Sequence, residues 1–415
     1  MHIFLITHYF EPEAGAPQRR WSALIDRFAA AGHSVTVFAP APHYPQGRVH
    51  AEHRKSLRQG TVQRRGDGVT VHRVAHLPHR GDIATRSIDH AFTAAAALVK
   101  ASRVARSMPP SVVIATAPAI ESLIAGQLIA RRFGAPFVAE MRDAWPDLVA
   151  FTAGTQASTS PLAMVKRLVH RFVTALQASA AVVVTTTQSF AEVLRQRGIA
   201  HVEVLRNGTT HTALPPIAEV SVEDPSRLRV LYMGTVGRSQ GLEVLIESVN
   251  RLAADNIPVD VRIIGHGADL AHLHRLNRAA GSVVDIRDAV APSEVRAHYE
   301  WADTTVVSLR DWEPFSWTVP SKLYELLATG RHITALVAGE AAGIVRTTGA
   351  GMVVSPGNAE ELAAAWRSLL QDRSLLDVGL RGRDWARQFA DFDALAAEYL
   401  GILQRVVDQH AINRR

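Results

Sequence analysis

Short runs of β-branched and apolar residues alternate with longer amphipathic segments along this chain of 415 residues. The alternation is typical of parallel sheets whose faces are covered by helices. In the first half it predicts strands at residues 2–6, 34–39, 69–73, 112–115, 137–140, 181–185 and 202–205. Between these strands it predicts helices at residues 17–31, 87–106, 119–133, 161–178 and 188–197.

A segment rich in proline and polar residues, 211–228, interrupts the pattern, which then starts again. The second series predicts strands at residues 229–233, 259–264, 283–286, 304–308, 332–336 and 351–354, with helices between them. Each series leads from strand through loop to helix, which is the arrangement of nucleotide-binding folds. We therefore predict an α/β protein with two Rossmann-like, doubly wound domains, 1–210 and 229–383, a linker at 211–228, and a terminal helical segment, 384–415.

Composition narrows the class of protein. Hydrophobic residues make up 47% of the chain and charged residues 20%, which is ordinary for a globular protein. The chain has no cysteine, which excludes disulfides and thiolate metal sites and fits a reducing compartment. No window approaches 18 consecutive apolar residues, and the N-terminal segment lacks a basic region. We expect a cytoplasmic protein, with peripheral contact at the inner membrane face as an alternative.

The charge is distributed unevenly along the chain. Residues 1–210 contain 24 Lys and Arg against 13 Asp and Glu, and the remainder contains 21 against 26. This asymmetry indicates an anionic partner for the first half. Nucleic acid fits poorly because the basic residues are scattered and aromatic residues make up only 6%. An anionic membrane fits better: Lys166, Arg167 and Arg171 lie among apolar residues, although an ordinary covering helix explains them equally well.

A turn of small residues around Gly15 and Ala16 follows the first strand and precedes a helix. Backbone amides and the helix dipole converge at such a turn, which can therefore bind an anionic group. A tight turn that needs glycine for its backbone is an equally good interpretation. The turn is not G-x-G-x-x-G, which disfavours a dinucleotide site.

Polar and aromatic residues also follow the buried strand 137–140. Arg142 and Asp143 stand at its carboxyl end, where ligands bind in open α/β sheets. Asp143 can accept a proton or hydrogen bond from a substrate hydroxyl, with Arg142 holding it ionised. A structural Arg–Asp pair is the alternative. Trp145 belongs to the rigid loop that follows, and Asn207 lies in an Asn-Gly turn before the linker.

The second series contains two glycine-rich loops and a distinctive helix. The glycines at 234, 237 and 241, with Arg238, let a phosphate approach the backbone, and Gly265 and Gly267 end the next strand. Within 318-TVPSKLYELLATG-330, Ser321 is expected as the N-cap and Gly330 as the stop. Glu325 can accept two hydrogen bonds from a ribose diol, with Lys322 or Arg238 neutralising a diphosphate. A glutamate that completes a helix surface is the alternative.

Taken together, these stretches resemble the family 4 glycosyltransferases of the GT-B fold, in particular the branch similar to WbuB-like L-fucosamine transferases. The residues that carry the resemblance are HYFEPEAGAPQRR, HYPQG at 43–47, MRDAWPD, RNG, YMGTVGRSQGLE, IIGHG, VPSKLYELLATG and GEAAGIV followed by GAGMVVSPGNAEEL. The resemblance implies two domains that face each other across a cleft and a terminal helix that crosses back to the first. It also implies retaining, metal-independent transfer from a sugar nucleotide, with a UDP-sugar favoured over a GDP-sugar and no further cofactor.

The resemblance also implies roles for individual residues. Catalysis falls to Arg142, Asp143, Arg238 and Lys322. The donor nucleotide contacts Gly234, Thr235, Gly237, Gln240, Gly265, Gly267, Arg287, Ser321, Leu323 and Glu325, the last through its ribose. The acceptor or the sugar contacts Gly15, Ala16, His43, Tyr44, Trp145, Asn207 and Trp317. No metal ligand is expected.

Four positions depart from the family pattern. Trp317 stands where the family has the first of two paired glutamates, and Arg142 where relatives have a histidine. Thr235 and Gln240 replace a phosphate-binding Arg and Lys. We expect transfer to a lipid-linked sugar in surface polysaccharide or glycolipid assembly. The alternatives are a soluble small-molecule acceptor in natural-product or thiol biosynthesis, a sugar-nucleotide 2-epimerase, and a non-catalytic scaffold.

Overall fold

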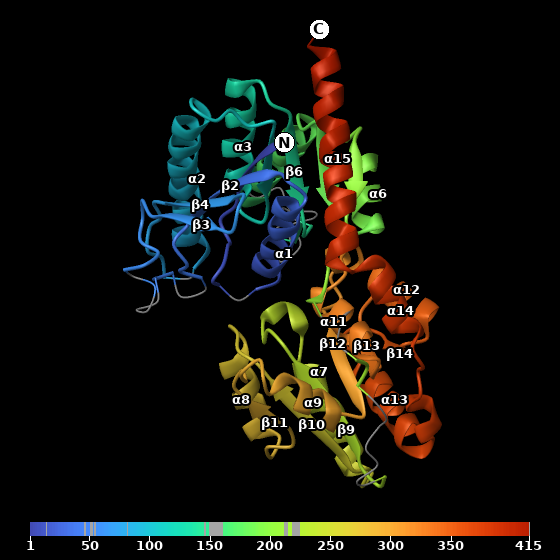
Figure 1. Cartoon of the computed structure of the whole chain (residues 1–415). Helices are drawn as coiled ribbons and strands as arrows, with labels where there is room; N and C mark the ends of the chain where they lie inside the picture. The colour runs from blue at the N-terminus through green and yellow to red at the C-terminus, as the bar shows by residue number, and fades with distance from the viewer. Residues whose placement is uncertain are drawn as a thin grey trace. The chain divides into compact units, whose positions relative to one another are not determined.

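Two compact units make up the protein (Figure 1). One contains Met1–Asn207 together with Phe392–Arg415, and the other contains Gly208–Asp391. Each is built on a largely parallel sheet covered by helices, which confirms the predicted α/β class. The computed structural model describes residues 1–13, 15–44, 47–49, 53, 55–80, 82–144, 147–148, 161–210, 215–217 and 225–414.

An eight-stranded sheet in the order β3-β4-β2-β1-β5-β6-β7-β8 forms the first unit. All pairs are parallel except β3 with β4. The sequence pattern does not predict β3, because this edge strand is partly exposed and three of its four residues are polar. The strands are β1 (His2–Ile6), β2 (Ser34–Pro40), β3 (Val62–Arg65), β4 (Val69–Val74), β5 (Val112–Thr116), β6 (Phe137–Met141), β7 (Val182–Thr185) and β8 (Val202–Val204).

The helices of the first unit bury apolar stripes against this sheet. The last helix of the chain packs on the first: the ring of Tyr399 lies 5.9 Å from Trp21 and 5.8 Å from Phe28. These rings belong to the buried core of the unit. The helices are α1 (Ala16–Ala30), α2 (Ile83–Ala105), α3 (Ile120–Phe133), α5 (Pro161–Ala178), α6 (Gln188–Gln196) and α15 (Phe392–Asn413).

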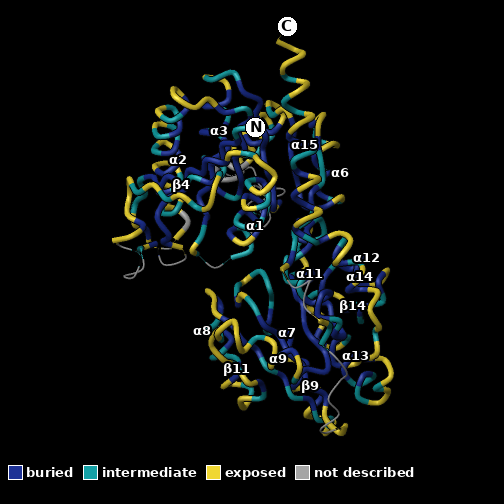
Figure 2. The backbone as a smooth tube through the Cα atoms, in the orientation of Figure 1, coloured by how far each residue is buried: buried dark blue, intermediate teal, exposed yellow. Residues whose placement is uncertain are grey.

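A six-stranded, all-parallel sheet in the order β11-β10-β9-β12-β13-β14 forms the second unit. In chain order this is the 3-2-1-4-5-6 arrangement of dinucleotide-binding folds. Its strands β9, β12 and β13 are wholly buried, whereas the edge strand β11 and the outer sides of the surrounding helices are largely exposed (Figure 2). The strands are β9 (Leu228–Met233), β10 (Val259–Ile264), β11 (Asp285–Arg287), β12 (Thr304–Ser308), β13 (His332–Leu336) and β14 (Gly351–Val354).

Helices cover both faces of the second sheet. Right-handed crossovers place α7 and α8 on one face and α9, α11 and α12 on the other, and α13 returns to pack on α7. The predicted terminal segment is two helices, of which α14 belongs to the second unit and α15 to the first. The helices are α7 (Glu243–Ala254), α8 (Leu270–Ala279), α9 (Val295–Trp301), α10 (Glu313–Ser316), α11 (Ser321–Thr329), α12 (Gly339–Thr348), α13 (Ala359–Gln371) and α14 (Arg381–Phe389), with short 3-10 turns η3 (Arg238–Gln240) and η4 (Arg373–Leu376).

The strand order reverses once in each parallel region. In the first sheet the reversal lies between β1 and β5, and in the second between β9 and β12. At this reversal, the connections that leave the two adjacent strands run to opposite sides of the sheet. They leave a space beside the carboxyl ends of the strands, and ligands of doubly wound sheets bind there. Most of the candidate residues lie on loops at this edge. None of the helices that the structure describes has the length and hydropathy of a membrane-spanning segment.

Candidate functional site

The glycine loop of the second unit leaves β9 directly beside the strand-order reversal. Gly234 N donates to Ile264 O at 2.9 Å, and Tyr232 Oη donates to Thr235 O at 2.6 Å. Gly265 packs against this loop so closely that a Cβ on it would lie 1.8 Å from Gly234 O, at a φ of +156°. A Cβ on Gly267 would lie 2.1 Å from a carbonyl of the same loop. Both glycines therefore hold the first loop in place.

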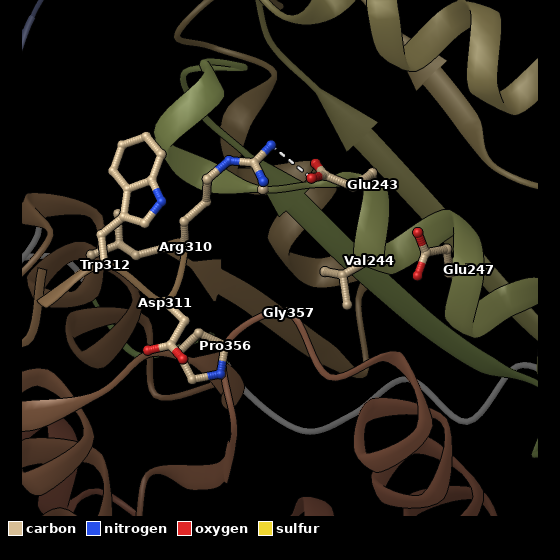
Figure 3. A pocket seen from close by; sticks show the side chains of 10 residues that line it. Glu243, Val244, Glu247, Arg310, Asp311, Trp312, Pro356 and Gly357 are labelled. Carbon is tan, nitrogen blue, oxygen red and sulfur yellow. Dashed lines mark ion pairs between the residues drawn. The ribbon is translucent and has the colours of Figure 1, made fainter. Parts of the chain in front are cut away.

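The far end of the glycine loop is fixed from β12. Arg310 N donates to Ser239 O at 2.9 Å, its Nε donates to Arg238 O, and its guanidinium pairs with Glu243 at 2.6 Å. Figure 3 shows Arg310 and Glu243 directed toward one another. Gln240 Oε1 accepts from Gly237 N at 3.1 Å and so closes the turn from within. Arg238 itself is exposed.

A pocket of about 290 Å³ opens beside this clamp (Figure 3). Its walls come from the start of α7 and from the loops that follow β9, β12 and β14, so it lies at the carboxyl edge and on the α7 side of the sheet. Glu247 and Asp311 add acidic groups, and Trp312 adds an aromatic ring. The pocket is lined by Gly241, Glu243, Val244, Glu247, Leu309, Arg310, Asp311, Trp312, Pro356 and Gly357.

Glu325, in the second turn of α11, is tightly held. Lys322 Nζ lies 2.9 Å from Glu325 Oε2, and Tyr299 Oη donates to Glu325 Oε1 at 2.7 Å. Lys322 also reaches the glycine loop, since a Cβ on Gly234 would lie 3.4 Å from Lys322 Cε. An ammonium group, a carboxylate and a bare backbone turn therefore lie together. Glu325 is thus not merely a solvated helix-surface residue.

Ser321 does not cap α11 as the sequence analysis expects. The N-cap is Pro320, with extended backbone, and no side chain caps the helix. The proline fixes its own φ in a range that suits this position, so the helix begins at Ser321. Leu323 is fully buried and its amide donates to Pro320 O at 2.9 Å, so the structure does not expose it as a nucleotide contact. Trp317 is half-buried after α10.

Arg287 is the last residue of β11, the edge strand that lies next to β10. Its carbonyl accepts from Gly265 N at 3.1 Å, which ties β11 to the second glycine loop. Its guanidinium is exposed and pairs with Asp285 at 2.6 Å. The hydrogen bond and charge of Asp285 raise the pKa of Arg287, so the guanidinium stays charged.

Arg142 and Asp143 form no ion pair among the described residues, so the structural Arg–Asp pair named as the alternative is absent. The Arg142 guanidinium is buried and donates to Ala117 O at 2.7 Å and to Thr116 Oγ1 at 3.2 Å. The carbonyl at the end of β5 therefore takes the place of Asp143 as its partner. Asp143 reaches solvent at the end of β6. The protein around it raises the pKa of its carboxyl by desolvation, an effect that Arg142 opposes.

Glu13 gathers the predicted residues near the start of α1. Its Oε1 accepts from the backbone amides of His43 at 2.8 Å and Tyr44 at 2.9 Å, and Oε2 accepts from Gln18 at 2.9 Å. Burial raises the pKa of Glu13, and these hydrogen bonds oppose the rise. Gly15 is the extended N-cap before Ala16, where a Cβ would meet the Gln18 side chain. The turn after β1 and the loop after β2 are thus one group.

A cluster of histidines lies behind that group. Asp89 Oδ2, from α2, lies 2.9 Å from His43 Nε2 and 3.3 Å from His8 Nε2. Desolvation raises the pKa of Asp89, but the hydrogen bonds from His43 and His8 outweigh it and the net pKa is lowered. Burial lowers the pKa of His8 to about 4. Burial also lowers that of His43, but Asp89 and the Ala41 carbonyl reverse this and raise it overall.

Asn207 follows a segment that one buried arginine fixes. Arg20 donates to Glu140 Oε1 at 2.9 Å, to Arg206 O at 2.5 Å and to Leu205 O at 3.1 Å. Arg20 and Glu140 are both buried, so the pair is shielded from water. Asn207 is half-buried at the end of this segment. Trp145 lies outside the described residues.

The geometry of both units agrees with the comparisons to known proteins. A model described as "Glycosyl transferase 4-like domain" matches residues 15–208, and a second, "Glycosyl transferases group 1", matches residues 227–372. The two models divide the chain as the two sheets do and together match most of it. This chain belongs to the glycosyltransferases.

Individual relatives of this glycosyltransferase match it over nearly their full length. WcaI of Escherichia coli (strain K12), assigned to colanic acid biosynthesis as a glycosyl transferase, is 23% identical over 384 residues, which cover 89% of this chain and 92% of WcaI. Sucrose-phosphate synthase from Thermosynechococcus elongatus superposes with a TM-score of 0.73 at 18% identity, covering 98% of this chain and 99% of that one. HepE of Anabaena, in complex with UDP-glucose, gives 0.67 at 15% identity, covering 98% and 100%. These likenesses confirm the GT-B fold.

The structure brings together Gly234, Lys322 and Glu325, to which the sequence analysis gives roles at the donor nucleotide or its diphosphate. Their roles as a donor site stay predictions. Two residues that hold this group were missed: Tyr299, which orients Glu325, and Arg310, which clamps the glycine loop. Neither belongs to a motif, because each acts from another strand or helix. In the first unit Asp89 was missed for the same reason, whereas His8 and Glu13 lie in the quoted stretch HYFEPEAGAPQRR and were not assigned to the site.

Proposed function

We propose that this glycosyltransferase moves a sugar from a nucleotide diphosphate sugar to an acceptor hydroxyl. The observation that carries the proposal is the group of Gly234, Lys322 and Glu325 at the carboxyl edge of the second sheet. Glu325 provides acceptor oxygens for a ribose diol, and Lys322 and Arg238 provide positive charge for a diphosphate. The glycine loop lets that diphosphate approach the backbone amides closely.

The proposed donor is a UDP-sugar in preference to a GDP-sugar. HepE, with which this chain shares its fold, has been solved in complex with UDP and with UDP-glucose. Arg287, exposed at the end of β11, is the proposed contact to the base. Thr235, Gln240 and Gly237 form the proposed phosphate turn, with Gln240 holding its shape.

The proposed transfer retains the configuration at the anomeric carbon and needs no metal at the diphosphate. The acceptor oxygen bonds to the anomeric carbon on the face from which the nucleotide leaves, and the bond from that carbon to the diphosphate breaks. A phosphate oxygen of the leaving group takes the hydroxyl proton. Positioning and positive charge then supply most of the catalysis. Asp143, exposed at the end of β6, is the proposed group that orients the acceptor hydroxyl.

The proposed acceptor is a lipid-linked sugar in surface polysaccharide or glycolipid assembly, as in the WbuB-like branch. WcaI is assigned to colanic acid biosynthesis, and WaaG, a structural neighbour with a TM-score of 0.63 at 14% identity, is involved in lipopolysaccharide biosynthesis. Helix α5 supports a membrane partner. Met164, Leu168 and Phe172 form a stripe along it and are 66%, 68% and 51% exposed, and Arg167 and Arg171 flank the stripe in exposed positions. Such a face suits an anionic membrane surface, which we place on the cytoplasmic side.

Calorimetric titration with UDP, GDP and dTDP, each with and without EDTA, tests the donor. We expect UDP to bind without metal. Glu325→Ala should weaken UDP binding by about 1–3 kcal/mol, the cost of leaving hydrogen-bonding partners unpaired, or about 5- to 150-fold. Glu360→Ala is the matched control, because Glu360 is an exposed glutamate in the first turn of α13. If no nucleotide binds, or Glu325→Ala binds UDP as the wild type does, the ribose assignment is wrong.

Sedimentation with lipid vesicles tests the membrane partner. The full chain should pellet with vesicles that contain phosphatidylglycerol and stay in solution with neutral phosphatidylcholine vesicles, with binding that decreases as salt increases. Replacing Leu168 and Phe172 by glutamate should abolish pelleting, because it puts negative charge on the apolar stripe. Equal pelleting with neutral vesicles, or no effect of the double substitution, would contradict a membrane role for α5.

A further inference from the structure

Three buried side chains of the first unit direct possible ligand atoms at one point. Asp89 Oδ2 lies 2.9 Å from His43 Nε2 and 3.3 Å from His8 Nε2, and the three ligand atoms lie within 4.8 Å of one another. Zinc bonds of about 2.0–2.2 Å at tetrahedral angles place neighbouring ligand atoms about 3.3–3.6 Å apart. Small shifts of the side chains are therefore enough to surround an ion.

The contacts behind these atoms orient them for that task. His43 Nδ1 lies 2.7 Å from Ala41 O, so its proton is held there and Nε2 presents a lone pair. Asp89 Oδ1 accepts from Leu77 N at 2.7 Å and from Thr93 Oγ1 at 3.2 Å, which leaves Oδ2 for another partner. Metal-binding histidines and carboxylates are commonly held in this way.

A carboxylate as buried as Asp89 needs a positive partner. One candidate is a proton on His43, which would then donate from both ring nitrogens. The other is a metal ion between His43 Nε2 and Asp89 Oδ2. The position of His8 favours the ion, because its Nε2 also faces Asp89 Oδ2, at 3.3 Å, and an ion between the three side chains would use both imidazole nitrogens and this oxygen.

We propose that His8, His43 and Asp89 bind one divalent transition-metal ion, with Zn²⁺ as the best fit. Two imidazole nitrogens and one carboxylate oxygen suit this ion, and three protein ligands leave a fourth tetrahedral position open. The ion ties together the end of β1, the loop after β2, and α2. It is held by the first unit alone, so it is distinct from the metal-free diphosphate chemistry proposed for the second.

Metal binding to the unmodified chain is the first test. The full chain, purified with a tag that contains no histidine and stripped with a chelator, is titrated with Zn²⁺ by calorimetry, and the bound metal is counted by mass spectrometry. We expect one ion per chain and a higher unfolding temperature with Zn²⁺ than with chelator, because an ion that binds only the folded state stabilises it. Co²⁺ in the same site should give the visible absorption of a four-coordinate ion.

Substitutions locate the ion. His8→Ala removes one ligand but keeps the contact between His43 and Asp89, and should weaken Zn²⁺ binding more than about 100-fold, beyond the cost of losing an outer-shell partner. His201→Ala is the control, because His201 is an exposed histidine of the same unit. If circular dichroism shows that His8→Ala does not fold, the metal count and the cobalt spectrum of the wild type test whether the chain binds the ion. A wild type that binds neither ion, or a folded His8→Ala that binds Zn²⁺ equally well, overturns the proposal. UDP titration of the same preparations tests the second unit independently.

Discussion

Replacing Tyr299 by phenylalanine tests how Glu325 is positioned. The Tyr299 hydroxyl donates to Glu325 Oε1 at 2.7 Å and accepts from Lys322 Nζ at 3.4 Å. The residue is buried, so phenylalanine keeps the packing and removes these hydroxyl contacts. A hydrogen bond to a charged group contributes about 1.5–3 kcal/mol, but Lys322 still holds Oε2 at 2.9 Å. We therefore expect Tyr299→Phe to lose about 1–1.5 kcal/mol of UDP binding free energy, at or below the lower end of that range. This loss raises the Kd for UDP by about 5- to 13-fold.

A double-mutant cycle measured by UDP calorimetry separates this effect from a general loss of stability. If Tyr299 acts through Glu325, the double variant Tyr299→Phe with Glu325→Ala should lose little more than Glu325→Ala alone, with a coupling of at least about 0.5 kcal/mol. Tyr399→Phe is the control, since its buried hydroxyl has no hydrogen-bond partner among the described residues. Additive losses in the cycle, or wild-type affinity in Tyr299→Phe, would refute the positioning role.

Three further predictions concern the second unit. Asp303→Ala should cost about 3–5 kcal/mol in urea unfolding, because Asp303 is fully buried and pairs with two arginines, whereas Asp260→Ala, at an exposed pair, should cost about 1 kcal/mol or less. Gly265→Ala should destabilise the unit by about 1–3 kcal/mol and weaken UDP binding, because the new Cβ would collide with Gly234 O. An unchanged affinity for UDP would show that the loop of Gly234 is not part of the nucleotide site. Burial lowers the pKa of His332 to about 4. The free energy of unfolding should therefore be unaffected by this group above about pH 6.5 and should fall by up to about 3 kcal/mol as the pH drops to about 4. In His332→Leu the urea midpoint should depend less on pH.

The order of strands and helices follows closely from the sequence, because buried parallel strands are continuous apolar runs. The edge strand Val62–Arg65 is missed because half of it faces solvent and its residues are polar. The start of α11 is misplaced by one residue, because a proline before a helix and a serine at its start compete for the same position. Local pattern therefore predicts core elements well, and edges and caps less well.

The site is predictable only where its residues share one motif. Glu325 and Lys322 are one turn apart on α11, so their proximity follows from helix geometry. Tyr299 lies on α9 and reaches Glu325 only because both helices cover the same face of the sheet. His8 and Asp89 are 81 positions apart in the numbering and meet only through the order of β1, β2 and α2. Contacts of this kind depend on tertiary packing, which periodicity does not encode.

Some of the basic residues in the first half lie inside the protein and do not act at its surface. Arg20, Arg73 and Arg142 are all buried, and each donates to backbone carbonyls near strand ends. These carbonyls would otherwise lack partners in a region closed to water, so the three guanidinium groups serve the fold. Exposed groups such as Arg167 and Arg171 are the ones that an anionic partner can contact. The exposed face of α5 therefore says where such a partner would bind, which the net charge alone does not.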